Sequence, residues 1–213
     1  MSKKKKIGLI DYGMGNLNSV SKALQAVGGE IQWVESASQL SDCDALVLPG
    51  VGAFNVAVRN LKDQGLFEPV RDWISAGKPF LGICLGYQLL FTEGEEGGKK
   101  ITGLDIYDGA VRKFPKKKNL KVPHMGWNQL AMQAGGGKRA DVFQGLGQDP
   151  RFYFVHSYFP EPRDKKIVAT TTDYGVTFAS SISDGRLFAC QFHPEKSGDN
   201  GLKLLKNFVK GLN

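Results

Sequence analysis

The sequence predicts an α/β fold with an open, mainly parallel sheet flanked by helices and an antiparallel extension in the C-terminal half. Three observations support this prediction. In the first half of the chain, short apolar segments alternate with amphipathic segments of helical spacing, which is typical of parallel strands joined by crossover helices. Glycine-rich turns follow these apolar segments, at the carboxyl edge where such sheets carry their sites. The second half is mostly strand-like, and Asp-Gly pairs at 108–109 and 184–185 indicate hairpins.

The elements of the first half follow from hydrophobic periodicity. Leu17, Val20, Leu24 and Val27 form one face of the first helix, which a Gly-Gly pair ends. The third strand runs into the turn Pro49-Gly50-Val51-Gly52. The predicted strands are 6–10, 31–34, 45–48 and 79–83, and the predicted helices are 16–27, 53–64, 69–76 and 85–91.

The second half is predicted to consist of strands and one final helix. Leu202, Leu205, Phe208 and Val209 recur at helical spacing near the C-terminus. No segment is long enough to separate two domains, so residues 1–213 are expected to form a single domain in which residues 1–6 are a basic tail. The predicted strands are 104–107, 111–114, 152–158, 167–172, 177–183 and 186–192, with loops at 94–98 and 135–137.

The composition of the 213 residues is that of an ordinary soluble enzyme, with 41% hydrophobic and 23% charged residues. No run approaches the roughly 20 apolar residues that span a bilayer, so no membrane association is expected. The lysines at 3–6 precede an apolar stretch that stops at Asp11, too short for a signal peptide, and a cytoplasmic location is expected.

The net charge of +7 includes two lysine clusters, one at 3–6 and one between 113 and 121. Nucleic-acid binding is one interpretation of such clusters. No recognition helix or aromatic-studded basic strand accompanies them, so a solvated tail and a solvated loop are expected, with no nucleic-acid partner.

Three widely spaced cysteines, Cys43, Cys84 and Cys190, include no C-x-x-C pair. A structural zinc site is therefore not expected, and neither a metal nor a cofactor is predicted. A disulfide is not expected in a reducing cytoplasm, which leaves these cysteines as buried spacers or reactive thiols.

The sharpest local motif is Gly82-Ile83-Cys84-Leu85-Gly86, a G-x-C-x-G between a predicted strand and a predicted helix. It is the cysteine counterpart of the G-x-S-x-G nucleophile elbow. The glycines let the strand and helix approach closely, and the helix N-terminus favours the thiolate form of the sulfur. A buried structural cysteine in a glycine-rich turn fits the motif alone equally well.

A cysteine nucleophile needs a base and a group that orients the base. His193 ends a predicted strand, and Glu195 stands two residues further on, so both side chains can project in the same direction. Cys84, His193 and Glu195 are the predicted catalytic residues, in a Cys-His-carboxylate arrangement. The backbone amide of Leu85 and that of Val51 or Gly52 are the predicted oxyanion hole. A backbone-satisfied histidine and a plain strand-end turn are the alternatives.

Gly82 to Gln88 together with His193-Pro194-Glu195 resembles the class I glutamine amidotransferases. Further segments resemble, within that family, the glutaminase subunits of imidazole glycerol phosphate synthases, which serve histidine biosynthesis. The resemblance runs from about Lys6 to the C-terminus, and it implies a flavodoxin-like α/β fold. Tyr87 departs from the usual methionine, and the lysine clusters lie outside the family pattern. The further segments are 11–17, 49–54, 123–128, 154–158 and 193–197.

The resemblance implies that Cys84 attacks L-glutamine to release glutamate and ammonia. It implies that Gln88, Ser157 and Tyr158 bind the substrate, with Glu96 as a candidate for its ammonium group.

Ammonia is mostly protonated in neutral water and must reach a second reaction directly, and the chain leaves no room for a synthetic domain. A partner chain is therefore expected. The resemblance implies a (β/α)₈-barrel cyclase, paired with this chain as a heterodimer, that makes imidazole glycerol phosphate and aminoimidazole carboxamide ribotide. The predicted docking residues are Asn16, Pro123, Met125, Trp127 and Lys196.

Three other functions remain open at the level of sequence. The first is the glutaminase subunit of another class I amidotransferase, such as anthranilate synthase, against which segments 11–17 and 123–128 argue. The second is a cysteine hydrolase that acts alone with the same triad. The third is a non-catalytic basic binding module in which Cys84 is inert.

Overall fold

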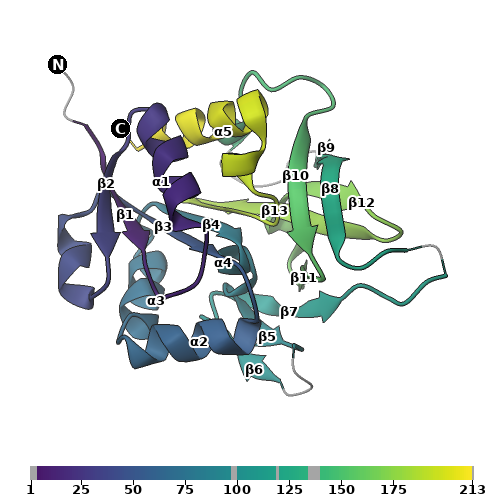
Figure 1. The fold of residues 1–213 in the computed structure, drawn as a ribbon, viewed down its shortest axis with the longest axis horizontal. Coiled ribbons are helices and arrows are strands. Elements are labelled where there is room, and N and C mark those ends of the chain that lie inside the picture. The colour runs from purple at the N-terminus through teal and green to yellow at the C-terminus, as the bar shows by residue number, and fades with distance from the viewer. Residues whose placement is uncertain (1–3, 97–99, 119, 134–139, 213) are drawn as a thin grey trace.

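A computed structural model describes residues 4–96, 100–118, 120–133 and 140–212. Within these residues, a central sheet of eight strands has the order β2-β1-β3-β4-β14-β13-β12-β9 (Figure 1). The first five strands in this order are parallel, and the last three run antiparallel to their neighbours. The strands are β1 (Lys6–Ile10), β2 (Glu30–Val34), β3 (Ala45–Gly50), β4 (Phe80–Cys84), β9 (Ala131–Met132), β12 (Val168–Asp173), β13 (Thr177–Asp184) and β14 (Leu187–Cys190).

Helices cover both faces of the parallel part of the sheet. α1 (Leu17–Ala26) and α5 (Gly198–Lys210) lie on one face, and α2 (Phe54–Asp63) and α3 (Phe67–Ser75) lie on the other (Figure 1). The period-2 alternation of the strands separates two cores: Val47 packs with the α1 and α5 side chains, whereas Leu48 packs with those of α2 and α3. Among the described residues, no helix is long and apolar enough to cross a bilayer.

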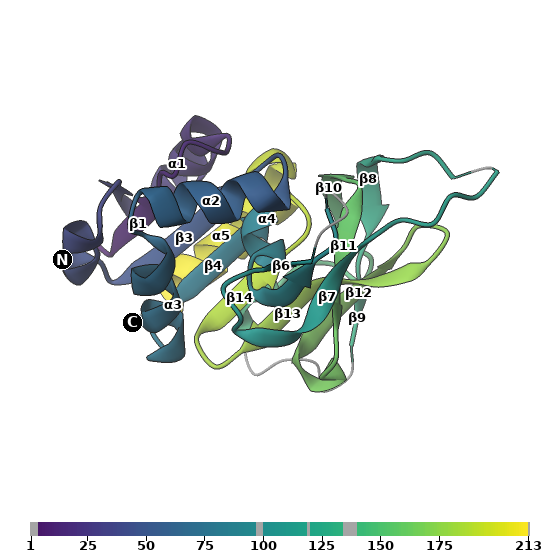
Figure 2. The same ribbon diagram turned by 90° about the horizontal axis from the view of Figure 1, so that it is seen from below.

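Two smaller sheets lie beside the antiparallel end of the central sheet (Figure 2). One pairs β8 (His124–Gln129) with β10 (Arg151–His156). The other has four strands, which are β11 (Tyr158–Pro162), β7 (Tyr107–Lys113), β5 (Phe91–Gly94) and β6 (Ile101–Thr102). The short helices are α4 (Leu85–Gln88), η1 (Ala37–Asp42), η2 (Ala140–Phe143), η3 (Lys165–Ile167) and η4 (Pro194–Lys196).

The predicted fold class is confirmed, and so is the hairpin at 184–185, where Asp184 pairs with Leu187. The helix predicted at 85–91 is wrong beyond Gln88. Phe91 begins β5 and pairs with Tyr107 of β7, while the carbonyl groups of Leu89 and Leu90 accept hydrogen bonds from a later loop. Phe91, which local periodicity assigned to the helix, therefore belongs to the four-stranded sheet.

The strand predicted at 104–107 and the hairpin at 108–109 are also wrong. Residues 104–106 form a loop, and Asp108 and Gly109 lie inside β7. Gly109 has a φ of 156° at an irregularity in the β5–β7 pairing, and a Cβ there would lie 2.7 Å from the Glu161 carbonyl oxygen. The Asp-Gly pair thus allows two strands to approach closely instead of forming a turn.

The strand predicted at 152–158 is two strands in different sheets, because the chain bends at Ser157 between β10 and β11. β8 was not predicted, since Met125 and Trp127 leave one of its faces apolar and exposed. The predicted loop at 135–137 lies outside the described residues, as do positions 97–98 of the loop predicted at 94–98.

Candidate active site

Cys84 lies where β4 ends and α4 begins, at the carboxyl edge of the parallel sheet. Its backbone has φ 54° and ψ −104°, a sparsely populated conformation for a residue with a side chain. Both flanking glycines are required by close contacts. A Cβ at Gly86 would lie 1.8 Å from the Leu48 carbonyl oxygen, and one at Gly82 would lie 2.9 Å from the Gly86 carbonyl oxygen. The geometry is that of a nucleophile elbow.

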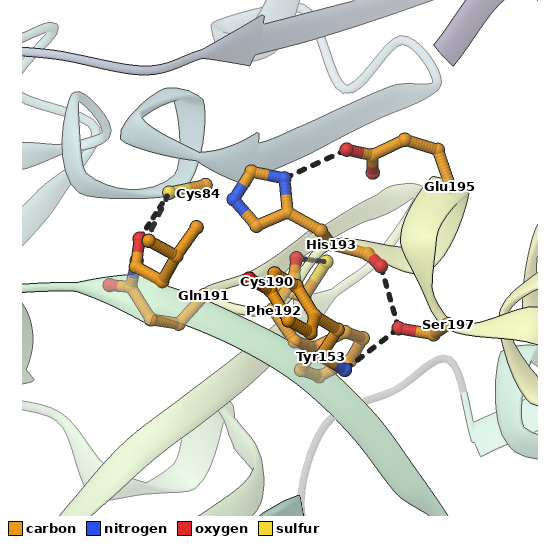
Figure 3. Close-up of polar contacts among 9 residues, drawn as sticks. Cys84, Tyr153, Cys190, Gln191, Phe192, His193, Glu195 and Ser197 are labelled. Atoms are coloured by element: carbon orange, nitrogen blue, oxygen red, sulfur yellow. Dashed lines mark hydrogen bonds and ion pairs between the residues drawn. The ribbon is translucent and has the colours of Figure 1, made fainter. Parts of the chain in front are cut away.

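His193 reaches the same edge because β14 pairs in parallel with β4. Its Nδ1 lies 2.8 Å from Glu195 Oε1, and both side chains are almost fully buried. In Figure 3 the imidazole ring lies between Glu195 and Cys84, with Nε2 turned toward the sulfur. That nitrogen has no hydrogen-bond partner of ordinary geometry among the described residues, which leaves it available for proton transfer.

The backbone around His193 is fixed by a neighbouring strand. The His193 N–H donates to the Tyr153 carbonyl oxygen of β10 at 2.9 Å. Ser197 Oγ donates to the His193 carbonyl oxygen at 2.6 Å and accepts from the Tyr153 N–H at 2.9 Å (Figure 3). The Ser197 side chain therefore joins the segment after β14 to β10.

Three influences set the protonation of His193. Burial lowers its pKa, but the negative charge and close approach of the Cys84 sulfur and of the Glu195 carboxylate outweigh burial and raise the pKa to about 10. At neutral pH the imidazole is accordingly protonated.

The chain has two other cysteines, Cys43 and Cys190. Cys43 is half-buried, and burial raises its pKa to about 11. Burial also raises the pKa of Cys190, with a smaller contribution from Glu195. All three thiols are free, and among the described residues no group of three histidine, cysteine or acidic side chains is arranged to hold a metal.

A cavity of about 490 Å³ opens in front of Cys84. All seven residues predicted to bind the substrate or the oxyanion line it. Glu96 lines it too, but Glu96 Oε2 also accepts the Phe54 N–H at 2.6 Å and so caps the start of α2, which the sequence did not indicate. The lining residues are Val51, Gly52, Ala53, Cys84, Leu85, Gln88, Glu96, Pro123, Val155, His156, Ser157 and Tyr158.

Gln191 is a site residue that the sequence reasoning missed. Its Nε2 lies 3.6 Å from Cys84 Sγ, and its Oε1 accepts a hydrogen bond from Gln88 Nε2 at 3.0 Å. Gln88 Nε2 also donates to the Tyr158 carbonyl oxygen at 2.9 Å. Gln191 stands two residues before His193, so the period-2 alternation of an extended chain was the signal that could have found it.

The five predicted docking residues are all exposed at the surface. Met125 and Trp127 of β8 are 62% and 55% exposed. The elements that carry them are contiguous: β8 pairs with β10, β10 contacts η4, and η4 contacts α1. Asn16 precedes α1 and Lys196 ends η4, so these residues belong to neighbouring elements.

A cysteine on a strand–helix turn of an open α/β sheet, facing a histidine–carboxylate pair, is the arrangement of hydrolases with a cysteine nucleophile. The family model described as glutamine amidotransferase class-I matches residues 8–212. The chain therefore belongs to the class I glutamine amidotransferase family and is an enzyme of that family.

Similar proteins agree with this assignment. The chain is 48% identical to imidazole glycerol phosphate synthase subunit HisH of Moorella thermoacetica, over 95% of this chain and 93% of the relative. It is also 48% identical to the subunit of that name from Syntrophotalea carbinolica, over 95% of this chain and 98% of the relative. A chain in the structure of PurLQS from Thermotoga maritima has the same fold, with a TM-score of 0.73, 20% identity and coverage of 99% of this chain and 100% of that one.

Proposed function

We propose that this chain is the glutaminase subunit of an imidazole glycerol phosphate synthase. It hydrolyses L-glutamine to glutamate and ammonia and passes the ammonia to a partner cyclase. The observation that carries the proposal is the strained Cys84 at the mouth of a 490 Å³ cavity, beside the buried His193–Glu195 pair. The relatives named as synthase subunits, which match almost the whole chain, support the choice of this subfamily.

The reaction begins with attack of Cys84 Sγ on the carboxamide carbon of glutamine. The tetrahedral oxyanion is stabilised by the Leu85 amide and by that of Val51 or Gly52, both of which belong to the cavity wall. Protonated His193 gives its proton to the departing nitrogen, and ammonia leaves a thioester on Cys84. Neutral His193 then takes a proton from water, the resulting hydroxide attacks the thioester, and glutamate is released.

The substrate is held along the cavity. Gln88 contacts the glutamine side chain near Cys84, and Ser157 and Tyr158 bind the amino-acid end through their backbone groups. Glu96 Oε2 is engaged by Phe54, so Oε1 is the oxygen available for the substrate ammonium.

The partner is a (β/α)₈-barrel cyclase that forms a heterodimer with this chain, a single domain. It makes imidazole glycerol phosphate and aminoimidazole carboxamide ribotide, and its location with this chain is the cytoplasm, where free thiols persist. An exposed Trp and Met side by side on one strand are suited to anchor an interface. Pro123, Asn16 and Lys196 complete this docking face.

The test compares two cysteine variants in a glutamine-dependent cyclisation assay with the cyclase of the same organism. Cys84→Ala is expected to abolish glutamate release while the complex still forms, and Cys43→Ser is expected to retain turnover. Retained hydrolysis in Cys84→Ala would remove the nucleophile assignment. Hydrolysis of other amides or esters as well as glutamine would favour a hydrolase acting alone.

A further inference from the structure

Two buried histidines take no part in the mechanism above. His124 of β8 and His156 of β10 face each other in the strand register, with His124 Nδ1 3.0 Å from His156 Nε2. Both are almost fully buried among aromatic rings. Ring centroids lie 4.0 Å apart between His124 and Tyr174 and 5.2 Å apart between His156 and Phe178. The packing holds both imidazoles in a single orientation.

The hydrogen bonds at the two ends of this pair fix where its protons lie. The Tyr158 carbonyl oxygen only accepts, so His156 Nδ1, at 2.9 Å, carries a proton. At the other end, the Asn128 amide donates to the Asp173 carbonyl oxygen and accepts from the Gln129 N–H, which fixes its orientation. Asn128 Nδ2 therefore donates to His124 Nε2 at 3.3 Å.

Burial keeps both rings neutral. It lowers the pKa of His156 to about 3, against a smaller opposing effect of the bond to the Tyr158 carbonyl, and lowers the pKa of His124 to about 4. In a neutral His156 with Nδ1 protonated, Nε2 accepts, so His124 Nδ1 is the donor between the rings. Every bond from Asn128 to Tyr158 then points in the same direction, and no donor faces a donor.

This series of hydrogen bonds ends at the cavity in front of Cys84. The Tyr158 carbonyl oxygen accepts from His156 Nδ1 and from Gln88 Nε2, each at 2.9 Å. Gln88 Nε2 also donates to Gln191, and Gln191 contacts Cys84 Sγ. A shift of the Tyr158 carbonyl would therefore move the Gln88 amide, which lies in the wall of the cavity.

We infer that His124 and His156 are positioning residues, whose hydrogen-bond chain from Asn128 fixes the Tyr158 carbonyl and thereby sets Gln88 for binding glutamine. The inference rests on the proposed function only in naming glutamine as the ligand. His156 also lines the cavity, but its two ring nitrogens are engaged by His124 and by the Tyr158 carbonyl oxygen. Both histidines therefore act through that carbonyl and the Gln88 side chain.

The experiment uses the full chain and two reagents that both alkylate Cys84. A glutamine-shaped diazoketone needs the Gln88 contacts, whereas iodoacetamide needs only the thiolate. His156→Leu removes the bond to Tyr158 and is expected to slow diazoketone labelling about tenfold, the effect of one hydrogen bond, with iodoacetamide labelling unchanged. His156→Asn, whose amide nitrogen can replace Nδ1, is expected to recover most of the lost rate.

Asn128→Asp gives a second test, because a carboxylate cannot donate to His124 Nε2. It is expected to slow the diazoketone selectively and to raise the KM for glutamine more than it lowers kcat. Thr172→Val is the matched control: it removes the hydroxyl bond to the Gln129 carbonyl oxygen of β8 but leaves the chain intact. It is expected to lower stability without changing either labelling rate.

The outcomes separate this inference from the proposed function. Folded His156 variants that label like the wild type with both reagents, or that slow equally with both, would overturn the positioning role. Wild-type protein that reacts with iodoacetamide but not with the diazoketone would overturn the glutaminase assignment instead. Independently of activity, two-bond ¹H–¹⁵N spectra are expected to show a protonated Nδ1 and an unprotonated Nε2 in both histidines. The opposite tautomer at His156 would contradict the proposed order of hydrogen bonds from Asn128 to Tyr158.

Discussion

His193 is the residue whose charge balance decides how the site works. Its two neighbours act in the same direction, since both the Cys84 sulfur and the Glu195 carboxylate favour the imidazolium over the buried neutral ring. In the proposed mechanism, the proton needed by the departing ammonia is thus already on His193 before the substrate arrives. Because Glu195 is itself buried and meets His193 at 2.8 Å, it also fixes the plane of the ring.

Glu195→Gln tests this balance. The amide keeps the shape but loses the charge, so the pKa of His193 is expected to fall, because the carboxylate is one of the groups that raise it. Turnover of glutamine is expected to drop by roughly 10²-fold, the lower end for an impaired general acid–base group. The alkaline limb of the pH profile of kcat/KM is expected to move to lower pH.

The control for this change is Glu161→Gln, which alters an exposed carboxylate away from the cavity. It is expected to leave both rate and pH profile unchanged. A Glu195→Gln enzyme with an unmoved alkaline limb would show that Glu195 does not set the protonation of His193.

The sequence was informative at the residue level wherever local spacing carries the chemistry. The flanking glycines pointed to Cys84 and the separation of two pointed to His193 and Glu195, and the structure brings these three side chains together. Gln191 and the His124–His156 pair were missed because their partners are distant in sequence: Gln191 meets Gln88, and the two histidines meet only when β8 pairs with β10. No local pattern encodes a contact that depends on strand pairing.

At the scale of elements, the site depends on how closely α4 crosses β3. Gly86 lies so near the Leu48 carbonyl that any side chain would overlap it, with 1.8 Å from the added Cβ to the oxygen. The crossing brings the start of α4, with the Leu85 amide, against the turn that follows β3. The backbone contact between Gly86 and Leu48 therefore brings together the two segments that carry the proposed oxyanion residues.

Gly86→Ala is expected to destabilise the fold by at least about 3 kcal/mol, since the methyl group meets backbone that cannot move aside alone. Urea unfolding monitored by tryptophan fluorescence would measure the loss. Gly147→Ala is the matched control, because a Cβ there meets no atom within 4 Å, and its effect is expected to stay within about 0.5 kcal/mol. Equal stability of the two variants would mean that the crossing is not tight.

Element boundaries were predictable where an apolar run is buried on both sides, as in β1, which the sequence placed at 6–10. Element boundaries were not predictable where the segment pairs with a strand of a second sheet. Phe91 continues the apolar pattern of α4 but pairs with Tyr107 of β7. The segment predicted as one strand is divided at Ser157 between two sheets. Both differences arise from pairing partners outside the local segment.

At the scale of the whole molecule, the exposed apolar side of β8 predicts where a partner binds. Trp127→Ala is expected to weaken the complex with the cyclase by about 2 kcal/mol, or roughly 30-fold in Kd, as for a central aromatic anchor. The stability of the isolated chain is expected to change little, since Trp127 is 55% exposed. Isothermal titration calorimetry would measure the affinity.

The matched control for this prediction is Trp33→Ala. Trp33 lies on β2, at the opposite edge of the central sheet from β9, and is 38% exposed. It is expected to leave the affinity unchanged. Equal losses in the two variants would indicate that binding does not depend on the β8 face.

The same buried histidine pair is expected to make the whole fold sensitive to acid. The folded-state pKa values of about 4 for His124 and about 3 for His156 lie below the ordinary value of 6.5. Between these values and pH 6.5 the unfolded chain binds more protons, so the free energy of unfolding decreases as the pH falls through this window. Each histidine contributes a slope of up to about 1.4 kcal/mol per pH unit.

A double variant, His124→Gln with His156→Asn, isolates this contribution, because the carboxylates that titrate in the same range are shared with the wild type. Urea unfolding at a series of pH values is expected to show a flatter pH dependence in the variant, even though its stability at pH 7 is lower. The free energies of unfolding of the two proteins are expected to approach each other as the pH falls from 6.5 toward 4. Only the wild type has buried neutral histidines, so only the wild type is destabilised by their protonation in the unfolded chain. Parallel curves over that window would mean that the folded histidines bind protons as readily as the unfolded ones. That result would contradict the donor-to-acceptor order from Asn128 to Tyr158, which requires neutral rings.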